Sequence, residues 1–228
     1  MVVAKLRVAA LVTGGKDSAL ALHRAMKSGC TVAYLVTMIP QREDSWMFHY
    51  PNIHLADLFA EAVGIPQVKA ETSGEKEAEL QDLKKVLATL DIDGLVSGAI
   101  SSEYQKTRID RICAELGLKS VAPLWHQDPR KLLTELVKLK METIIVGVYA
   151  YGFTVDWLGR KIDEAAINDL VQLNKSFQVS LVGEGGEYET IVLDTPFFDK
   201  KIQLIETEKI WENQSGYLHI KKAVLIEK

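Results

Sequence analysis

The first half of the chain alternates short apolar runs with segments of helical periodicity, and this alternation restricts the fold more than any other feature. Apolar runs predict strands at 6–12, 31–38, 66–71 and 94–98, with a further short strand near Val121. Apolar residues at helical spacing predict helices at 17–28, 53–63, 75–90 and 102–116. Strands that alternate with helices form βαβ units, so we expect a doubly wound parallel sheet with helices on both faces.

The second half has a different pattern. A helix over 130–140 and a strand over 142–152 still fit an α/β layout, but from Gln178 the chain reads as strands and turns. Pro123 and Pro129 bracket the connection between the two patterns. We therefore predict a domain over 1–125 and a smaller C-terminal α+β domain over 126–228.

Composition excludes several classes of protein. Of the 228 residues, 47% are hydrophobic and 25% are charged, which is typical of a globular chain rather than a disordered one. The formal charge of -4 is unlike that of a protein that coats nucleic acid, so we expect no stable nucleic-acid binding. No apolar stretch approaches the roughly 20 residues that a membrane span needs, and we expect a cytoplasmic protein without membrane contact. Cys30 and Cys113 are the only cysteines, and their sequence setting predicts buried thiols in a reducing compartment rather than a disulfide or a zinc site.

The first predicted strand runs into "TGGKDS", residues 13–18, before a helix begins. Free amides at a helix N-terminus attract an anion, and Gly14 and Gly15 let the backbone approach it closely. Lys16 would add a mobile cation and Ser18 a hydroxyl, while Asp17 would cap the helix or bind Mg²⁺. The alternative is a simple strand-to-helix turn in which a polar side chain caps the helix. The spacing of the Walker loop does not fit, because Ala10 and Asp17 stand where glycine and Ser or Thr are needed.

The string "GEGGEYET", residues 183–190, is poor material for a packed strand, because glycine costs backbone entropy and close carboxylates repel. It is either a solvated hairpin loop with its glutamates in water, or a substrate loop that binds a cation or steers ammonia.

A third string, "SGAISSEYQKTRIDRIC", follows the strand at 94–98, at the edge where open α/β sheets bind ligands. On the helix that begins there, Tyr104, Arg108 and Arg111 share a face, and an arginine at this place could meet a phosphate or a carboxylate. For Arg111 we expect an ordinary solvated face paired with Glu103, Asp110 or Glu115.

The loop at Thr13 resembles the pyrophosphate loop S-G-G-x-D-S of the N-type ATP pyrophosphatases, and the threonine keeps the hydroxyl of the first serine. With "GEGGEYET", "SGAISSEYQ", "MFHYPNIHLADLFAEAVGIP" and "APLW", the whole chain resembles the diphthine-ammonia ligase family of that superfamily. The resemblance implies an adenine nucleotide alpha hydrolase-like (HUP-type) first domain and a substrate-recognition second domain. It also implies an ATP-dependent ligase that activates the carboxylate of diphthine, on translation elongation factor 2, as an acyl adenylate. Ammonia then displaces AMP and leaves diphthamide.

The same resemblance implies the site residues. Nucleotide contacts are expected from Thr13, Gly14, Gly15, Lys16, Asp17, Ser18, Met38 and Gly98, with Mg²⁺ at Asp17. Catalytic roles are expected for Lys16, Asp17, Arg108, Glu184, Glu187 and Glu189. Substrate contacts are expected from His49, Tyr104, Gln105, Gly185, Gly186, Tyr188 and Thr190. The substrate carries a trimethylammonium group, whose charge one of the three glutamates would offset while Tyr188 or a tryptophan stacks on it.

Two other functions keep the nucleotide loop. One is amidation or thiolation of a small molecule or a tRNA base, for which a basic patch of Lys106, Arg108, Arg111 and Lys119 is conceivable. Sulfur transfer usually needs a reactive thiolate, and neither cysteine has an electropositive sequence setting. The other is a nucleotide-binding regulator without chemistry, which the lysine, aspartate and serine of the loop argue against. The sequence leaves homo-oligomerisation open.

Overall fold

The computed structural model describes residues 5–40, 52, 55–72 and 76–228, and the polypeptide divides into two compact units. The first unit comprises Met1–Thr13, Asp17–Ala60 and Gly64–Trp125. The second comprises His126–Lys228 together with two short segments from the first half, Gly14–Lys16 and Glu61–Val63. Three residues of the "TGGKDS" string, Gly14–Lys16, therefore belong to the second unit.

A parallel sheet of five strands forms the first unit, in the order β3-β2-β1-β4-β5. Its strands are β1 (Arg7–Leu11), β2 (Thr31–Pro40), β3 (Gln67–Thr72), β4 (Gly94–Val96) and β5 (Lys119–Val121). The connecting helices are α1 (Lys16–Lys27), α2 (Ala56–Val63), α3 (Lys76–Leu87) and α4 (Glu103–Leu116). This is the predicted doubly wound parallel sheet, and its elements begin and end within a few residues of the predicted positions.

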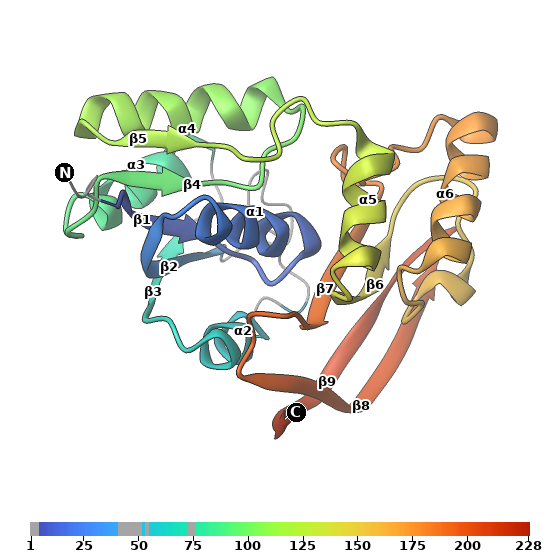
Figure 1. The fold of residues 1–228 in the computed structure, drawn as a ribbon. Coiled ribbons are helices and arrows are strands. Elements are labelled where there is room, and N and C mark those ends of the chain that lie inside the picture. Colours follow the sequence, from blue (N-terminus) through green and yellow to red (C-terminus); the bar gives the residue numbers. More distant parts are fainter. Residues whose placement is uncertain (1–4, 41–51, 53–54, 73–75) are drawn as a thin grey trace. The chain divides into compact units, whose positions relative to one another are not determined.

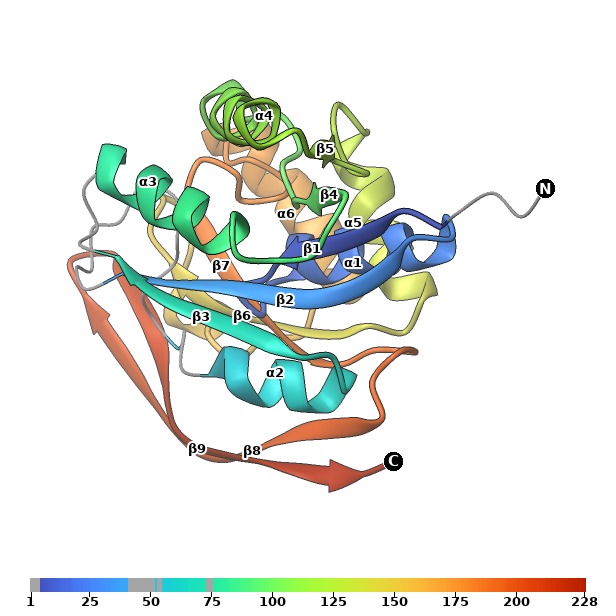
Figure 2. The same ribbon diagram turned by 90° about the vertical axis from the view of Figure 1, so that its left-hand side faces the viewer.

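The connections of a parallel sheet are right-handed, so a reversal in strand order places successive helices on opposite faces. The helices α3 and α4 cover one face, where Leu80, Leu83 and Ile112 pack against Ala9 and Val36 of the strands. Figure 2 shows α3 and α4 on one side of β2 and β3, with α2 on the other. The order in which strands are added to the sheet reverses between β1 and β4. The carboxyl ends of the strands at such a switch point form the usual ligand site of an open α/β sheet.

The second unit is built on an antiparallel sheet of four strands in the order β7-β6-β9-β8. Its strands are β6 (Glu142–Val148), β7 (Tyr188–Asp194), β8 (Lys200–Glu212) and β9 (Ser215–Glu227). Two helices, α5 (Pro129–Lys138) and α6 (Glu164–Phe177), pack against each other, and a short 3-10 helix, η2 (Val155–Trp157), precedes α6. A smaller α+β C-terminal unit is thus present, as predicted.

Two elements differ from the sequence-based expectation. The strand expected over 142–152 ends at Val148, and a turn follows it. The helix α6 was not predicted, although Asp163 caps it by accepting a hydrogen bond from the Ala166 amide at 2.8 Å. Its buried residues Ala166, Ile167 and Leu170 have helical spacing, and this is the signal that could have found it. Among the described residues, no helix is long and apolar enough to span a bilayer.

The core beneath α3 makes a first prediction. Leu83 is fully buried, so Leu83→Ala should lower the free energy of unfolding by about 2 to 5 kcal/mol, through lost transfer energy and a residual cavity. Urea unfolding followed by far-ultraviolet circular dichroism measures the change. The matched control is Met26→Ala on α1, which is 37% exposed and should cost less than about 0.5 kcal/mol. Equal losses in the two variants would contradict the assigned core.

Candidate active site

The predicted nucleotide loop, residues 13–18, follows β1 and lies beside the connection after β4. Gly14 has φ of +84°, a left-handed conformation that residues with a Cβ adopt at a cost. The amide of Thr13 donates to the Ser18 hydroxyl at 3.5 Å, which closes the turn at the start of α1. A Cβ on Gly98 would lie 2.9 Å from the Asp17 carbonyl carbon and 3.0 Å from the Ser18 nitrogen. Glycine at 98 therefore allows the two connections to touch at the switch point of the sheet.

Lys16 lies in the second unit and is only 3% exposed. Its ammonium group donates to the Val182 carbonyl oxygen and lies 5.0 Å from the centroid of the Tyr188 ring. Its backbone amide donates to the Thr190 hydroxyl at 3.1 Å. The sequence analysis expected a mobile cation, whereas the structure holds this ammonium group against a carbonyl and an aromatic face, which compensate its buried charge.

The neighbouring glycine strengthens the same junction. The carbonyl of Gly14 accepts from the Val192 amide at 2.9 Å, and β7 is an edge strand of its sheet. The segment Gly14–Lys16 thus runs along β7 and satisfies part of that edge. The strings "TGGKDS" and "GEGGEYET" meet at Lys16 and Thr190, which are 174 positions apart in the sequence.

The carboxylate of Glu187 folds the turn before β7. One of its oxygens accepts from the Ser180 amide at 3.0 Å and the other accepts from the Gly185 amide at 2.8 Å. Gly186 has φ of +83°, and Gly183 has φ of +68° with its Cβ position 2.6 Å from the Tyr188 carbonyl oxygen. The two hydrogen bonds of Glu187 offset part of the cost of a turn that is rich in glycine and carboxylates. They also give Glu187 a structural role in the loop.

The remaining residues of this string have different surroundings. Tyr188 is 2% exposed, and its hydroxyl donates to the Leu181 carbonyl at 2.7 Å. Gly185 and Gly186 are exposed, whereas Glu184, Glu189 and Thr190 are half-buried. Tyr188 is therefore a core residue beneath Lys16 and not an open stacking surface. The predicted roles of Glu184 and Glu189 stay predictions.

The start of α4 holds the predicted arginine. Ser102 caps the helix by accepting from the Gln105 amide at 3.4 Å. The guanidinium of Arg108 stacks on the Tyr104 ring at 3.5 Å from its centroid, so these two predicted site residues form one unit. The pairing expected for Arg111 is confirmed, because its Nε lies 3.8 Å from the Glu115 carboxylate.

The basic patch considered for tRNA is partly neutralised. Lys106 forms an ion pair with Asp110 and lies 5.7 Å from the centroid of the Trp125 ring. Partial burial works to raise the pKa of Asp110, but the hydrogen bonds and the charge of Lys106 outweigh it and lower that pKa. The carboxylates of α4 therefore offset the cations of this face.

One residue that the sequence analysis missed lies at the switch point. Ser97 directly follows β4, is 5% exposed, and its hydroxyl has no hydrogen-bond partner within the described part of the chain. A buried hydroxyl without a partner is costly and indicates a ligand or a water. Met38, in contrast, has its side chain in the hydrophobic core, so only its backbone could contact a nucleotide.

Two further predictions concern His49 and the metal site. His49 lies outside the described residues. No group of three His, Cys, Asp or Glu side chains among the described residues could hold a metal ion, so Asp17 stands without a preformed cluster.

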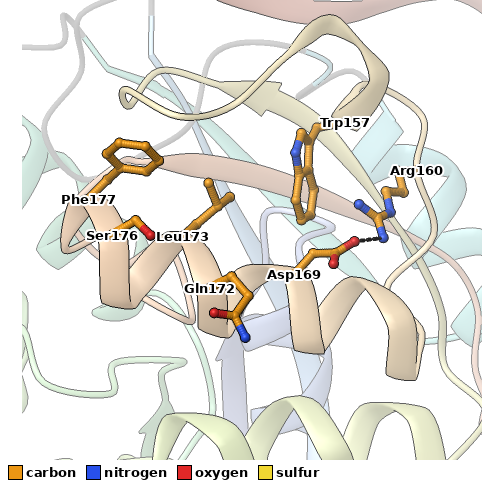
Figure 3. A pocket seen from close by; sticks show the side chains of 7 residues that line it. All are labelled: Trp157, Arg160, Asp169, Gln172, Leu173, Ser176 and Phe177. Carbon is orange, nitrogen blue, oxygen red and sulfur yellow. Dashed lines mark hydrogen bonds and ion pairs between the residues drawn. The ribbon is translucent and has the colours of Figure 1, made fainter.

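A cavity of about 260 Å³ in the second unit lies apart from these residues in the fold (Figure 3). It is lined by Trp157 and by one side of α6, and Arg160 there pairs with Asp169 and lies 4.3 Å from the centroid of the Trp157 ring. None of the predicted site residues lines it.

Comparison with known proteins identifies the family. The model of the diphthamide synthase N-terminal domain matches residues 6–120, and that of the diphthamide synthase C-terminal domain matches residues 128–226. The chain belongs to the diphthamide synthase family. The resemblance inferred from the sequence motifs is thereby confirmed.

Curated relatives carry the name diphthine--ammonia ligase. The Homo sapiens protein is 32% identical over 93% of this chain and 88% of its own length, and the Danio rerio protein is 32% identical over 93% and 91%. The Schizosaccharomyces pombe protein is 34% identical over 96% of this chain, which spans only 40% of that longer relative. Among solved structures, the U34-tRNA thiolase NcsA from Methanococcus maripaludis matches with 15% identity and a TM-score of 0.38, over 78% of this chain and 68% of its own. That likeness is too low to carry an argument.

The turn before β7 makes a second prediction. Glu187→Ala removes both acceptors, so hydrogen exchange at the Ser180 and Gly185 amides should accelerate by about tenfold, since a charge-assisted hydrogen bond contributes on the order of 1.5 kcal/mol. Hydrogen-exchange NMR of the two amides measures the effect. Glu184→Ala is the control and should leave both rates unchanged. Unchanged exchange in Glu187→Ala would show that the carboxylate does not hold the turn.

Proposed function

We propose that this chain catalyses the ATP-dependent amidation of the diphthine carboxylate, with ammonia as the nitrogen donor and with AMP and pyrophosphate as the other products. Membership of the diphthamide synthase family and the names of its curated relatives support this reaction. The observation that carries the proposal is the contact of Lys16 with Val182, Tyr188 and Thr190, because it joins the nucleotide loop to the second motif.

The chemistry requires activation, because a carboxylate has no good leaving group. One of its oxygens attacks the α-phosphorus of ATP, and the bond from that phosphorus to pyrophosphate breaks. The nitrogen of ammonia then attacks the acyl carbon, the carbon–oxygen bond to AMP breaks, and the nitrogen loses a proton. A nearby carboxylate can take that proton, and Glu184 and Glu189 are the candidates because Glu187 is bound to two amides.

The loop fits a triphosphate. Gly98 lets the connection after β4 approach the backbone of Asp17 and Ser18, the first turn of α1 presents amides, and the Ser97 hydroxyl lies buried at the same edge. Mg²⁺ usually keeps several waters and binds through one or two carboxylates plus phosphates, so Asp17 alone is a sufficient protein ligand. A bound Mg²⁺ would neutralise charge on the phosphates during adenylation.

The role proposed for Lys16 follows from its position. Because its ammonium lies against Val182 and Tyr188, it holds the "GEGGEYET" turn beside the start of α1. A phosphate placed at the loop would compete with the Val182 carbonyl for this cation, and charge building on the phosphates would favour the phosphate. Arg108, stacked on Tyr104, is the further candidate for the carboxylate or AMP.

The finer identity of the partners also belongs to this proposal. We take the acceptor to be diphthine on translation elongation factor 2 and the compartment to be the cytoplasm, where that factor acts. The domain roles follow, with nucleotide binding in 1–125 and substrate recognition in 126–228. The curated relatives are named as ligases, and this favours amidation over thiolation or a regulatory role.

The test combines protein mass with nucleotide products. Incubation with ATP, Mg²⁺, ammonium and diphthine-bearing elongation factor 2 should convert the carboxylate into an amide, with one AMP for each amide. Lys16→Ala should lower the rate by about 10²-fold or more. The substitution removes the positive charge that would stabilise the phosphates, and it also removes the support of the turn. Lys27→Ala, an exposed lysine of the same helix, is the control and should keep the wild-type rate. AMP without a change in protein mass would show a different acceptor.

The thiolation alternative has its own test. Burial, followed by the charge of Asp110, raises the pKa of the Cys113 thiol to about 11, and Cys113 is 1% exposed. A raised pKa keeps the thiol protonated, so at pH 8 iodoacetamide should modify the half-buried Cys30 at least tenfold faster than Cys113. Peptide mass spectrometry measures both rates, and urea should equalise them. Rapid modification of Cys113 in the folded protein would reopen sulfur chemistry.

A further inference from the structure

The backbone amide and the ammonium group of Lys16 both donate to one short segment of the second unit. The amide donates to the Thr190 hydroxyl at 3.1 Å, and the ammonium donates to the Val182 carbonyl oxygen. Thr190 lies on β7, and Val182 lies in the turn that precedes this strand. Oxygen atoms of the protein therefore occupy donors that the proposed function assigns to the phosphates of ATP.

The amide of Lys16 belongs to the first residue of α1, and the first amides of a helix have no acceptor within the helix. Such amides are the groups that bind an anion at a helix N-terminus. The Thr190 hydroxyl supplies an acceptor from 174 positions away. A phosphate oxygen is the better acceptor, because hydrogen bonds to a charged group are roughly twice as strong as those between neutral groups.

The ammonium group of Lys16 is held in a buried position. The residue is 3% exposed, and the ammonium lies 5.0 Å from the centroid of the Tyr188 ring as well as on the Val182 carbonyl. A nucleotide enters from solvent, so the ammonium must leave this position to meet a phosphate. Its departure frees the Val182 carbonyl and removes one support of the turn before β7.

Other contacts keep the loop and the turn in place while these donors change partners. The Gly14 carbonyl accepts from the Val192 amide at 2.9 Å, and a phosphate oxygen cannot compete for a bond in which the loop itself is the acceptor. The Tyr188 hydroxyl donates to the Leu181 carbonyl at 2.7 Å, and this bond does not involve the lysine either. The change is thus confined to the donors of Lys16 and to the middle of the turn.

We propose that Thr190 is a positioning residue whose hydroxyl holds the place of a phosphate oxygen until ATP binds. The inference rests on the proposed function, which puts the phosphates at the first turn of α1. ATP takes both donor groups of Lys16, and the turn that carries Glu184 is released from the lysine. Because binding free energies are linked, contacts that hold Lys16 on the turn weaken ATP binding, and ATP weakens these contacts by the same factor. The turn therefore becomes free for the acceptor only after the nucleotide is in place.

The affinity for a non-hydrolysable ATP analogue with Mg²⁺, measured by isothermal titration calorimetry, tests the sign of this effect. Thr190→Val keeps the shape of the side chain and removes the competing hydroxyl, so it should tighten binding by about fivefold. Thr190→Ser keeps the hydroxyl and should bind like the wild type. Thr207→Val, which changes an exposed threonine of β8, is the matched control and should leave binding unchanged.

A purely structural role of Thr190 does not predict tighter binding. If the hydroxyl only caps α1, its loss leaves a helix amide without an acceptor, and Thr190→Val should bind the analogue equally well or more weakly. Either result would overturn this inference and leave the proposed function standing. If the wild type binds no analogue, the proposed function fails and this inference fails with it.

Hydrogen exchange in the wild type tests the release of the turn without any substitution. The reporters are the amides of Gly183 and Gly186, which donate to the Ser180 and Gly183 carbonyls at 3.2 and 3.1 Å. A bound ligand usually slows exchange where it contacts the protein, whereas release of the turn should make these two amides exchange several-fold faster with the analogue bound. The amides that pair β8 with β9 are the internal reference and should not change. Slower or unchanged exchange at both glycines would contradict the inference.

Discussion

The buried ammonium of Lys16 is the contact on which the candidate site depends. A charged group that is 3% exposed needs strong compensation, and the Val182 carbonyl, the Tyr188 ring and the strand contacts of its own backbone supply it. Because Tyr188 and Thr190 belong to β7, Lys16 ties the segment Gly14–Lys16 to the end of the "GEGGEYET" string within the second unit. Glu187 completes the arrangement by folding the turn that carries Val182 and Glu184 into place.

This arrangement suits a two-step amidation, in which the acyl group must stay beside the nucleotide until ammonia arrives. Proximity of the reacting groups contributes several kcal/mol to such reactions, provided that the groups are held in one geometry. A short loop that both receives phosphates and supports the acceptor motif would provide it.

Local patterns were enough to predict the parallel sheet, because apolar runs and helical spacing are properties of neighbouring residues. They also predicted that Arg111 pairs with a nearby carboxylate, which is Glu115, whereas the burial expected for both cysteines holds for Cys113 and not for the half-buried Cys30. They could not predict the partners of Lys16, because Val182 lies 166 positions away and the residues next to Lys16 in the sequence do not indicate this contact. Ser97 was missed because a lone serine after a strand has no pattern until its burial is known.

The most direct test of the central claim follows an oxygen atom. Diphthine labelled with ¹⁸O in its carboxylate should transfer one ¹⁸O to AMP during amidation, because the carboxylate oxygen bonds to the α-phosphorus and leaves with AMP. Mass spectrometry of the AMP formed in a single turnover, in unlabelled water, measures the transfer. One ¹⁸O in AMP for each amide is the predicted result. Amide formation with unlabelled AMP would contradict an acyl adenylate, and with it the proposed use of the nucleotide loop.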